Sequence, residues 1–336
     1  MSDRHAYEFQ VLVTPTQPLS HGQGTEGNIQ VLRRTQRNVC VNGEWMGLEV
    51  PSVSGSAFKA VLREAAVDYY LDVLGVPDGS LSRDGLRLLL KGGKVGQGGQ
   101  GTPHEEARRL RRLFPPLAVF GFMDGAVSSP GLLQSCELVP YTVELVEGGF
   151  FKGMAGRLKL PPIPDALTSA EVTYYRHDQS TSPLARYLPA EARTAIEDAR
   201  ANRAGKVAAK DQRREANESM PHTFEVIPAG TPLLGTLRLQ GANSIDLACF
   251  TLAMAFWKAR GARLGGGRGK GHGTCDVQMV SAIRLAAGVG PVPVNVEATL
   301  PAVTMDVSAG EAVAAEYAAH VASVREEALK LLGSAA

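Results

Sequence analysis

The sequence lacks the features of metal-binding, disulfide-bonded and membrane-spanning proteins. Its four cysteines, Cys40, Cys136, Cys249 and Cys275, lie far apart and form no CxxC pair, which argues against a structural zinc site and against a disulfide framework. The N-terminal stretch has no apolar signal core, and no apolar run approaches the length of a membrane span. We therefore expect a reduced, cytoplasmic protein without membrane contact.

The sequence also lacks the common catalytic motifs. It contains no HExxH, no GxSxG and no His/Asp cluster with metal-ligand spacing. A Walker loop around Lys270 is excluded, because Leu264 stands where its first glycine belongs and Gly271 where its hydroxyl belongs. "GQGGQG", residues 96–101, fits the dinucleotide fingerprint formally but follows no clear strand. We expect no metal and no cofactor, and keep a small-nucleotide-binding enzyme as an alternative.

Positive charge is unevenly distributed along an almost neutral chain. Lys and Arg number 35 against 34 Asp and Glu, a formal net charge of +1, so only local clusters indicate a partner. Residues 247–275 contain no acid but hold arginines, lysines and a histidine. The glycines of "LGGGRGKGHG" allow backbone N–H groups to approach an anion closely, and Arg268 and Lys270 add charge-assisted bonds. This stretch predicts a phosphate-binding loop.

A second candidate anion site lies at the start of a predicted helix, "PSVSGSAFKAVLREAAVDYYLDVLG", which Gly75 should end. The apolar stripe of this helix consists of Phe58, Leu62, Ala65 and Tyr69. Lys59 and Arg63 are spaced i, i+4 and share one face. Gly55 and Ser56 lie at the N-terminus, where free N–H groups favour an anion. The two sites together favour a strand of nucleic acid over a mononucleotide as the ligand.

The remaining regular elements predict an α+β fold. Ala6 begins an alternating strand, "HTFEVIPAGTPLLGTLRLQG" is typical of two strands around a PAGT turn, and "TCDVQMVSAIRL" is a further strand. The apolar stretch 243–264 predicts a helix, with Asn243 and Asp246 at cap spacing. This order is typical of a split βαβ, ferredoxin-like antiparallel sheet with helices on one face and large insertions.

Other segments predict less regular structure. We expect a polar loop over 19–39, an irregular glycine-rich stretch over 76–103, and one or two strands over 132–150. Residues 165–220 have few large apolar side chains, which indicates an extension beyond the core. Further helices are expected from Pro103 after a Thr102 cap, over 189–217 and over 308–333.

Three motifs, in this order, resemble the RAMP proteins, the repeat-associated RNA-binding subunits of CRISPR effector complexes. "VPSVSGSAFKAVLREA" resembles the "PGSSLKGALR" helix start of that family, "FEVIPAGTPLLGTLRL" its E-x-x-P-x-G-T strand pair, and "LGGGRGKGHG" its glycine-rich loop. The matches run from about residue 7 to 285. They are most similar to the backbone subunit, the Cas-seven-type protein, of type IV complexes, with type III as second choice.

The resemblance implies an RNA-binding role. It implies an RRM-like palm formed by 1–164 and 221–290 with an insertion at 76–130, a thumb at 165–220 and a C-terminal extension with a helix at 291–336. Copies would stack head to tail into a helical filament along a guide RNA and present it for base pairing with a target nucleic acid, beside the other subunits of an antiviral effector complex. The residues implied to contact RNA are His21, Arg33, Arg34, Arg37, Ser54, Gly55, Ser56, Lys59, Arg63, Gly266, Gly267, Arg268, Lys270 and His272.

One departure from the type III pattern concerns catalysis. In those relatives the loop after the first strand carries an aspartate that cleaves target RNA, whereas 20–39 contains no Asp, Glu26 is its only acid, and Asn28 lies near the expected place. An asparagine cannot take up a proton as a general base. We therefore expect a non-cleaving, type IV-like scaffold and no enzyme, and keep as an alternative a RAMP-type endoribonuclease that would use Glu26 or His21.

Overall fold

The computed structural model describes residues 4–27, 29–92, 103–124, 127–152, 158, 160–177, 194, 219–286, 290–294 and 307–333. They form an α+β fold with antiparallel sheets, as predicted. The Thr102 cap, and all of the predicted helix 189–217 except Thr194, lie outside the described residues. None of the described helices combines the length and the apolar character that crossing a membrane requires.

The central sheet has the strand order of a ferredoxin-like fold. Its strands are β1 (His5–Pro15), β8 (Leu133–Ser135), β9 (Val139–Pro140), β12 (Leu233–Ala242), β13 (Cys275–Ala286) and β14 (Gly290–Val294). The order is β14-β13-β1-β12-β8, with β9 also on β12, and β1 is antiparallel to both of its neighbours. The first strand therefore lies in the middle, between the strands that flank the second long helix, as a split βαβ requires.

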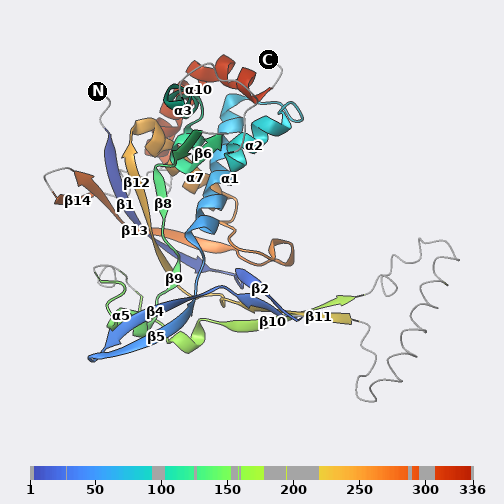
Figure 1. Cartoon of the computed structure of the whole chain (residues 1–336), viewed down its shortest axis with the longest axis vertical. Helices are drawn as coiled ribbons and strands as arrows, with labels where there is room; N and C mark the ends of the chain where they lie inside the picture. Colours follow the sequence, from blue (N-terminus) through green and yellow to red (C-terminus); the bar gives the residue numbers. More distant parts are fainter. Residues whose placement is uncertain are drawn as a thin grey trace.

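Two long helices, α1 (Gly55–Leu74) and α7 (Ser244–Ala259), cover one face of this sheet, and a third, α10 (Val307–Leu332), packs against both of them (Figure 1). The Ser54 hydroxyl caps α1 by accepting the Ala57 N–H, and Gly75 ends this helix at a φ of 71°. Asn243 and Asp246 form the predicted capping box of α7. The predicted Gly75 stop and the predicted cap of α7 are thereby confirmed, since both residue types satisfy free backbone groups. α7 ends at Ala259, earlier than the predicted helix over 243–264.

The two faces of β1 belong to different apolar clusters. Phe9 faces the helices and stacks on Phe250 of α7 with ring centroids 5.2 Å apart, and Phe58 of α1 packs on Trp257 at 5.5 Å. Leu12 lies on the opposite face of β1 and belongs to a smaller apolar cluster. That cluster includes side chains of β4 (Arg34–Val41), β5 (Glu44–Pro51) and α5 (Val143–Glu147). The sheet is therefore covered on both faces near the end of β1.

The segment after α1 contributes to the main core. The prediction of an irregular stretch over 76–103 is wrong in part, because α2 (Arg83–Lys91) forms there with a Ser82 cap and buries Leu88 and Leu89 fully. Its amphipathic face was obscured by the short length of the helix and the neighbouring glycines. The helix predicted from Pro103 is confirmed. The elements that follow α2 are α3 (Pro103–Leu113), α4 (Pro115–Phe120), β6 (Gly121–Asp124) and β7 (Val127–Pro130).

A second group of strands extends from the end of the sheet opposite to α3 and α10 (Figure 1). It consists of the β4–β5 hairpin and of β10 (Ala170–His177), β11 (Ser219–Val226), β3 (Ile29–Leu32) and β2 (Gly22–Glu26), paired in that order. The prediction of a polar loop over 19–39 is therefore wrong. Every residue of β2 is exposed, so no apolar alternation marks this strand, and pairing with β3 is what orders it.

The stretch 132–150 contains strands and a short helix. β8 and β9 agree with the predicted strands, but α5 follows them where strand was expected. The Thr142 hydroxyl accepts the Leu145 N–H and caps this helix. Downstream, a single 3-10 turn, η2 (Asp165–Leu167), precedes β10.

Candidate nucleic-acid interface

The glycine-rich loop, residues 264–274, is held against the chain that leaves β1. It contains a short 3-10 turn, η5 (Arg268–Lys270). The Leu264 N–H donates to the Gly273 carbonyl at 2.8 Å, which closes the loop on itself. Two N–H groups join it to its neighbour: Gly266 donates to Ser20 O at 2.7 Å, and Gly273 donates to Pro18 O at 2.9 Å. The loop is therefore docked on residues 18–21, which we call the central segment.

Glycine is required on the docked side of this loop, and open space adjoins its outer turn. Gly265 and Gly273 adopt left-handed φ values of 78° and 81°. A Cβ at Gly265 would collide with the Ser20 carbonyl, and one at Gly273 with the Leu264 carbonyl. At Gly269 a Cβ would meet nothing within 4 Å. The outer turn therefore faces open space, where its backbone can be approached.

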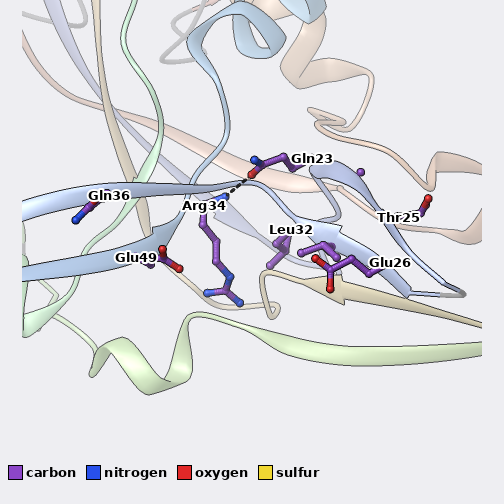
Figure 2. A pocket seen from close by; sticks show the side chains of 9 residues that line it. Gln23, Thr25, Glu26, Leu32, Arg34, Gln36 and Glu49 are labelled. Carbon is purple, nitrogen blue, oxygen red and sulfur yellow. Dashed lines mark hydrogen bonds between the residues drawn. The ribbon is translucent and has the colours of Figure 1, made fainter.

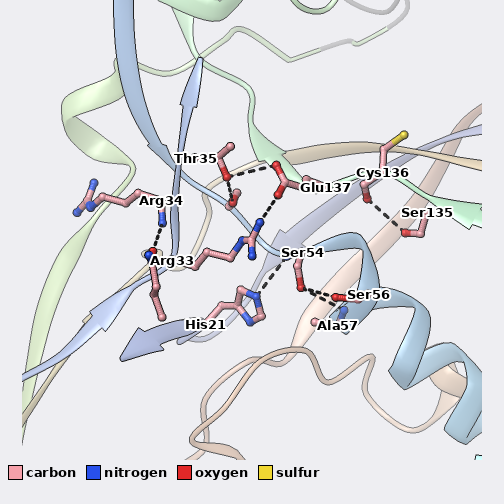
Figure 3. A network of polar contacts seen from close by, with 12 residues as sticks. His21, Arg33, Arg34, Thr35, Ser54, Ser56, Ala57, Ser135, Cys136 and Glu137 are labelled. Carbon is pink, nitrogen blue, oxygen red and sulfur yellow. Dashed lines mark hydrogen bonds and ion pairs between the residues drawn. The ribbon is translucent and has the colours of Figure 1, made fainter. Parts of the chain in front are cut away.

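The central segment also contacts the start of α1. The Ser54 N–H donates to His21 Nε2 at 3.2 Å, and the Ser56 hydroxyl donates to Ser54 Oγ at 3.1 Å (Figure 3). Burial, followed by the charge of Arg33, lowers the pKa of His21. The imidazole is therefore neutral near pH 7, consistent with its role as an acceptor. Consecutive residues of one segment thus carry the glycine-rich loop at Ser20 and the helix start at His21.

Arg33 and Arg37 converge on one carboxylate that the sequence analysis missed. Arg33 Nη2 lies 2.5 Å from Glu137 Oε1 (Figure 3), and Arg37 Nη2 lies 2.5 Å from Glu137 Oε2. The side chains of Arg33, Arg37 and Glu137 are 38%, 24% and 23% exposed. Within the described part of the chain, neither arginine Nε has a hydrogen-bond partner. Two cations of the predicted site therefore share one internal counterion, and the cluster keeps one net positive charge.

Arg34, the first residue of β4, does not join the Glu137 cluster. Its guanidinium is 3.7 Å from Glu225 of β11. It reaches into a hollow of about 440 Å³ between the β2–β3 and β4–β5 strand pairs, lined also by Glu26 and Glu49 (Figure 2). Among the described residues no three His, Cys, Asp or Glu side chains are grouped closely enough to hold a metal. Asn28 lies outside the described residues.

Lys59 and Arg63 are bonded to the protein itself. Lys59 Nζ donates to the Leu133 carbonyl at 2.8 Å, and Arg63 donates to the carbonyls of Phe120, at 2.5 Å, and Gly121, at 2.8 Å. Burial lowers the pKa of both side chains. They hold α1 against β8 and the end of α4, and a direct contact of either with a ligand stays a prediction. Gly55 is buried, and a Cβ there would collide with the Ser135 carbonyl, so this glycine has a packing role.

Lys270 and His272 join the glycine-rich loop to β10 and β11. Lys270 Nζ lies 4.0 Å from the ring centroid of Phe224 and 4.8 Å from that of Tyr174. His272 is only 2% exposed, and its Nε2 forms a hydrogen bond with the Tyr174 hydroxyl. Burial, then the charge of Lys270, lowers the pKa of His272. Lys270 is exposed, so its charge faces solvent while its ammonium group lies over the rings of Tyr174 and Phe224.

The structure therefore gathers only part of the predicted set at one place. The central segment brings together His21, Ser54, Ser56 and Gly266, while Gly267 and Lys270 lie on the same loop. For Arg268 only the backbone, at the start of η5, is described. Sequence reasoning missed Glu137, Tyr174 and Phe224. The aromatic side chains at 174, 175 and 224, on strands flanking the extension, were the available signal.

Comparison with known proteins gives evidence on the fold alone. No family model matches the sequence, and no curated protein matches it either. Among solved structures, a chain of a structure titled "Type IV-B CRISPR Complex" is similar with a TM-score of 0.50 and 23% sequence identity. The alignment covers 86% of this chain and 95% of that chain. The likeness therefore extends over nearly the whole of the solved chain and over most of this one.

Proposed function

We propose that this protein is an RNA-binding backbone subunit of a type IV-like CRISPR effector complex, which assembles head to tail along a guide RNA and presents it for base pairing with a target. The fold that it shares with a chain of a type IV-B CRISPR complex supports the assignment, as does the order of the three RAMP-like motifs. The observation that carries it is that the glycine-rich loop and the start of α1, the two predicted anion sites, are both hydrogen-bonded to the central segment.

The binding mechanism follows from the outer turn of the glycine-rich loop. Gly269 and Gly271 have open space beside them, so a phosphate can reach their backbone. Lys270 neutralises that phosphate, and the release of its counterions drives association. Sequence is then read by pairing between guide and target, so the protein needs no base-specific contact. The RNA 2′-hydroxyl supplies a handle for preferring RNA over DNA.

The geometry around His21 favours a scaffold over an endoribonuclease. A general base needs an accessible nitrogen, and His21 Nε2 already accepts the Ser54 N–H. Glu26 lines the 440 Å³ hollow together with Arg34 and Glu49, so it stays the candidate acid of the alternative. A cleavage assay with labelled target RNA distinguishes the two functions: intact RNA after prolonged incubation agrees with the scaffold, and cleavage abolished by Glu26→Gln contradicts it.

Lys270→Ala tests the RNA-binding proposal. We measure the affinity for an RNA of about 30 nucleotides by fluorescence anisotropy over a range of salt concentrations. Loss of one phosphate contact should lower the slope of log K against log salt by about 0.7, the value for single strands. Lys330→Ala, an exposed lysine on α10, is the matched control and should leave the slope unchanged. An equal slope in all three proteins removes Lys270 from the interface, and no binding at low salt refutes the function.

A further inference from the structure

A cationic hollow lies at the N-terminal end of α7, away from the glycine-rich loop. This hollow, the α7 pocket, has a volume of about 480 Å³ and is lined by Arg4, Arg108, Arg111, Arg112, Pro115, Ala118, Leu132, Asn243, Ile245, Asp246 and His320. It is built from the start of β1, from α3 and α4, from the first turn of α7 and from α10. The glycine-rich loop follows the opposite end of α7, and a helix of 16 residues is about 24 Å long. The α7 pocket is therefore a separate site.

The arginines of the α7 pocket exceed its acids. Arg112 is paired with Glu327 at 3.0 Å, but across the residues that the structure describes no carboxylate lies within ion-pair distance of Arg4, Arg108 or Arg111. Arg4 donates to the Gly241 carbonyl at 3.2 Å and Arg111 to the Pro130 carbonyl at 2.7 Å. These carbonyls orient the two guanidinium groups without neutralising them.

Two further observations indicate that the α7 pocket has positive charge left for an anion. Arg111 Nε is buried, and it has no hydrogen-bond partner in the described part of the chain. The acid that lines the pocket, Asp246, accepts the Asn243 N–H at 3.1 Å as part of the α7 capping box. Burial raises the pKa of Asp246, and the charges of Arg4, Arg111 and His320 act in the opposite direction. One acid already engaged in a cap does not balance these cations, so the pocket keeps a positive potential.

The chemistry of the lining indicates the class of ligand. All the fully charged cations of the pocket are arginines, whose planar fork matches the oxygens of a phosphate. The remaining wall is apolar and includes Pro115, Leu132 and Ile245, which suits a ring. The volume is in the range of small-molecule sites, about 300–1,000 Å³. A ligand that carries both a phosphate group and an organic ring matches the arginines and the apolar wall together.

We propose that the α7 pocket binds an organic phosphate of mononucleotide size, such as a nucleoside triphosphate. Its phosphates lie against Arg4, Arg108 and Arg111, near the N-terminus of α7, and its ring lies against the apolar wall. This site is independent of the proposed guide-RNA surface, because no residue of the α7 pocket belongs to the central segment or to the glycine-rich loop.

The test is calorimetric titration of the full-length chain, freed of nucleic acid, with ATP. The double variant Arg4→Ala/Arg108→Ala removes two cations that have no acidic partner among the described residues. It should bind ATP at least about tenfold more weakly, because charge-assisted hydrogen bonds are lost. Arg87→Ala, an exposed arginine on α2 outside the pocket, should bind like wild type. The melting temperatures of the unliganded variants should be equal, which separates a lost contact from a fold defect.

Separate arms identify the ligand. Inorganic phosphate should bind more weakly than ATP, because it lacks a ring for the apolar wall. An RNA of about 30 nucleotides should not displace ATP, and Lys270→Ala should bind ATP normally, so this site and the RNA surface can fail independently. The proposal is overturned if ATP does not bind, if the double variant binds ATP as tightly as wild type, or if RNA competes with ATP for the same arginines.

Discussion

Glu137→Gln separates the stability of the protein from its affinity for RNA. In the structure this single carboxylate holds both Arg33 and Arg37, with one oxygen 2.5 Å from each guanidinium. The glutamine has the same shape but no charge, so the shared counterion is lost; its one oxygen can still accept from one arginine, while its NH2 group cannot accept from the other. We expect the variant to unfold more easily and to bind RNA more tightly than wild type at low salt. If the role of Glu137 is purely structural, the variant should lose both stability and affinity for RNA.

The magnitudes follow from the exposure of the three side chains. They are 38%, 24% and 23% exposed, between the surface pairs worth less than about 1 kcal/mol and buried pairs whose breakage costs about 3–5 kcal/mol. The free energy of unfolding should therefore fall by about 1–3 kcal/mol. Loss of the one carboxylate frees one unit of positive charge, which should steepen the salt slope by about 0.7 if it neutralises a phosphate. The affinity ratio of variant to wild type should then fall about 2.6-fold between 50 and 200 mM salt.

The assay combines urea unfolding with RNA anisotropy at several salt concentrations. Thr35→Val is a useful companion, because Thr35 donates a hydrogen bond to Glu137 at 3.3 Å and its loss leaves the charge in place. That variant should keep the wild-type salt slope. If Glu137→Gln binds RNA with an unchanged slope, Arg33 and Arg37 do not face the guide, and the proposed surface must be redrawn without them.

Two further predictions concern the loop and pH. Gly273→Ala should lower the free energy of unfolding by about 2 kcal/mol or more, because φ is positive and a Cβ meets the Leu264 carbonyl, whereas Gly269→Ala should change it by less than about 1 kcal/mol; equal values contradict the docked loop. Folding lowers the pKa values of His21 and His272. Below the ordinary histidine pKa of about 6.5, these two residues therefore bind more protons in the unfolded chain than in the folded one. Urea midpoints should fall from pH 7.5 to 5.5, and less so in His21→Gln; identical pH dependence contradicts this.

The frame of the fold was predictable because its signals are local. The stripe of α1, the Gly75 stop and the Asn243–Asp246 capping box each act within a few residues, and β1 alternates because its two faces meet different clusters. β2 carries no such signal, since its residues are all exposed. Its order depends on β3, and that of β3 on β11, almost 200 positions away in the chain.

The candidate site was predictable as a set of segments but not as a set of contacts. Helix spacing correctly places Lys59 and Arg63 on one face, yet it cannot tell that the carbonyls of Leu133 and Phe120 lie within reach of them. Likewise, no local pattern joins Arg33 to Glu137, which is 104 residues away. Sequence reasoning therefore located the cations, and the structure decided which of them are already engaged.

Cross-linking of bound RNA tests the central claim most directly. A guide-length RNA carrying 4-thiouridine is bound to the full-length protein at low salt, irradiated, and the attached peptides are identified by mass spectrometry. If the glycine-rich loop and the start of α1 form one surface across the central segment, cross-links should appear in residues 264–274 together with 18–21 or 54–56. Cross-links confined to other parts of the chain, or loop cross-links without any from the other two segments, would contradict the account.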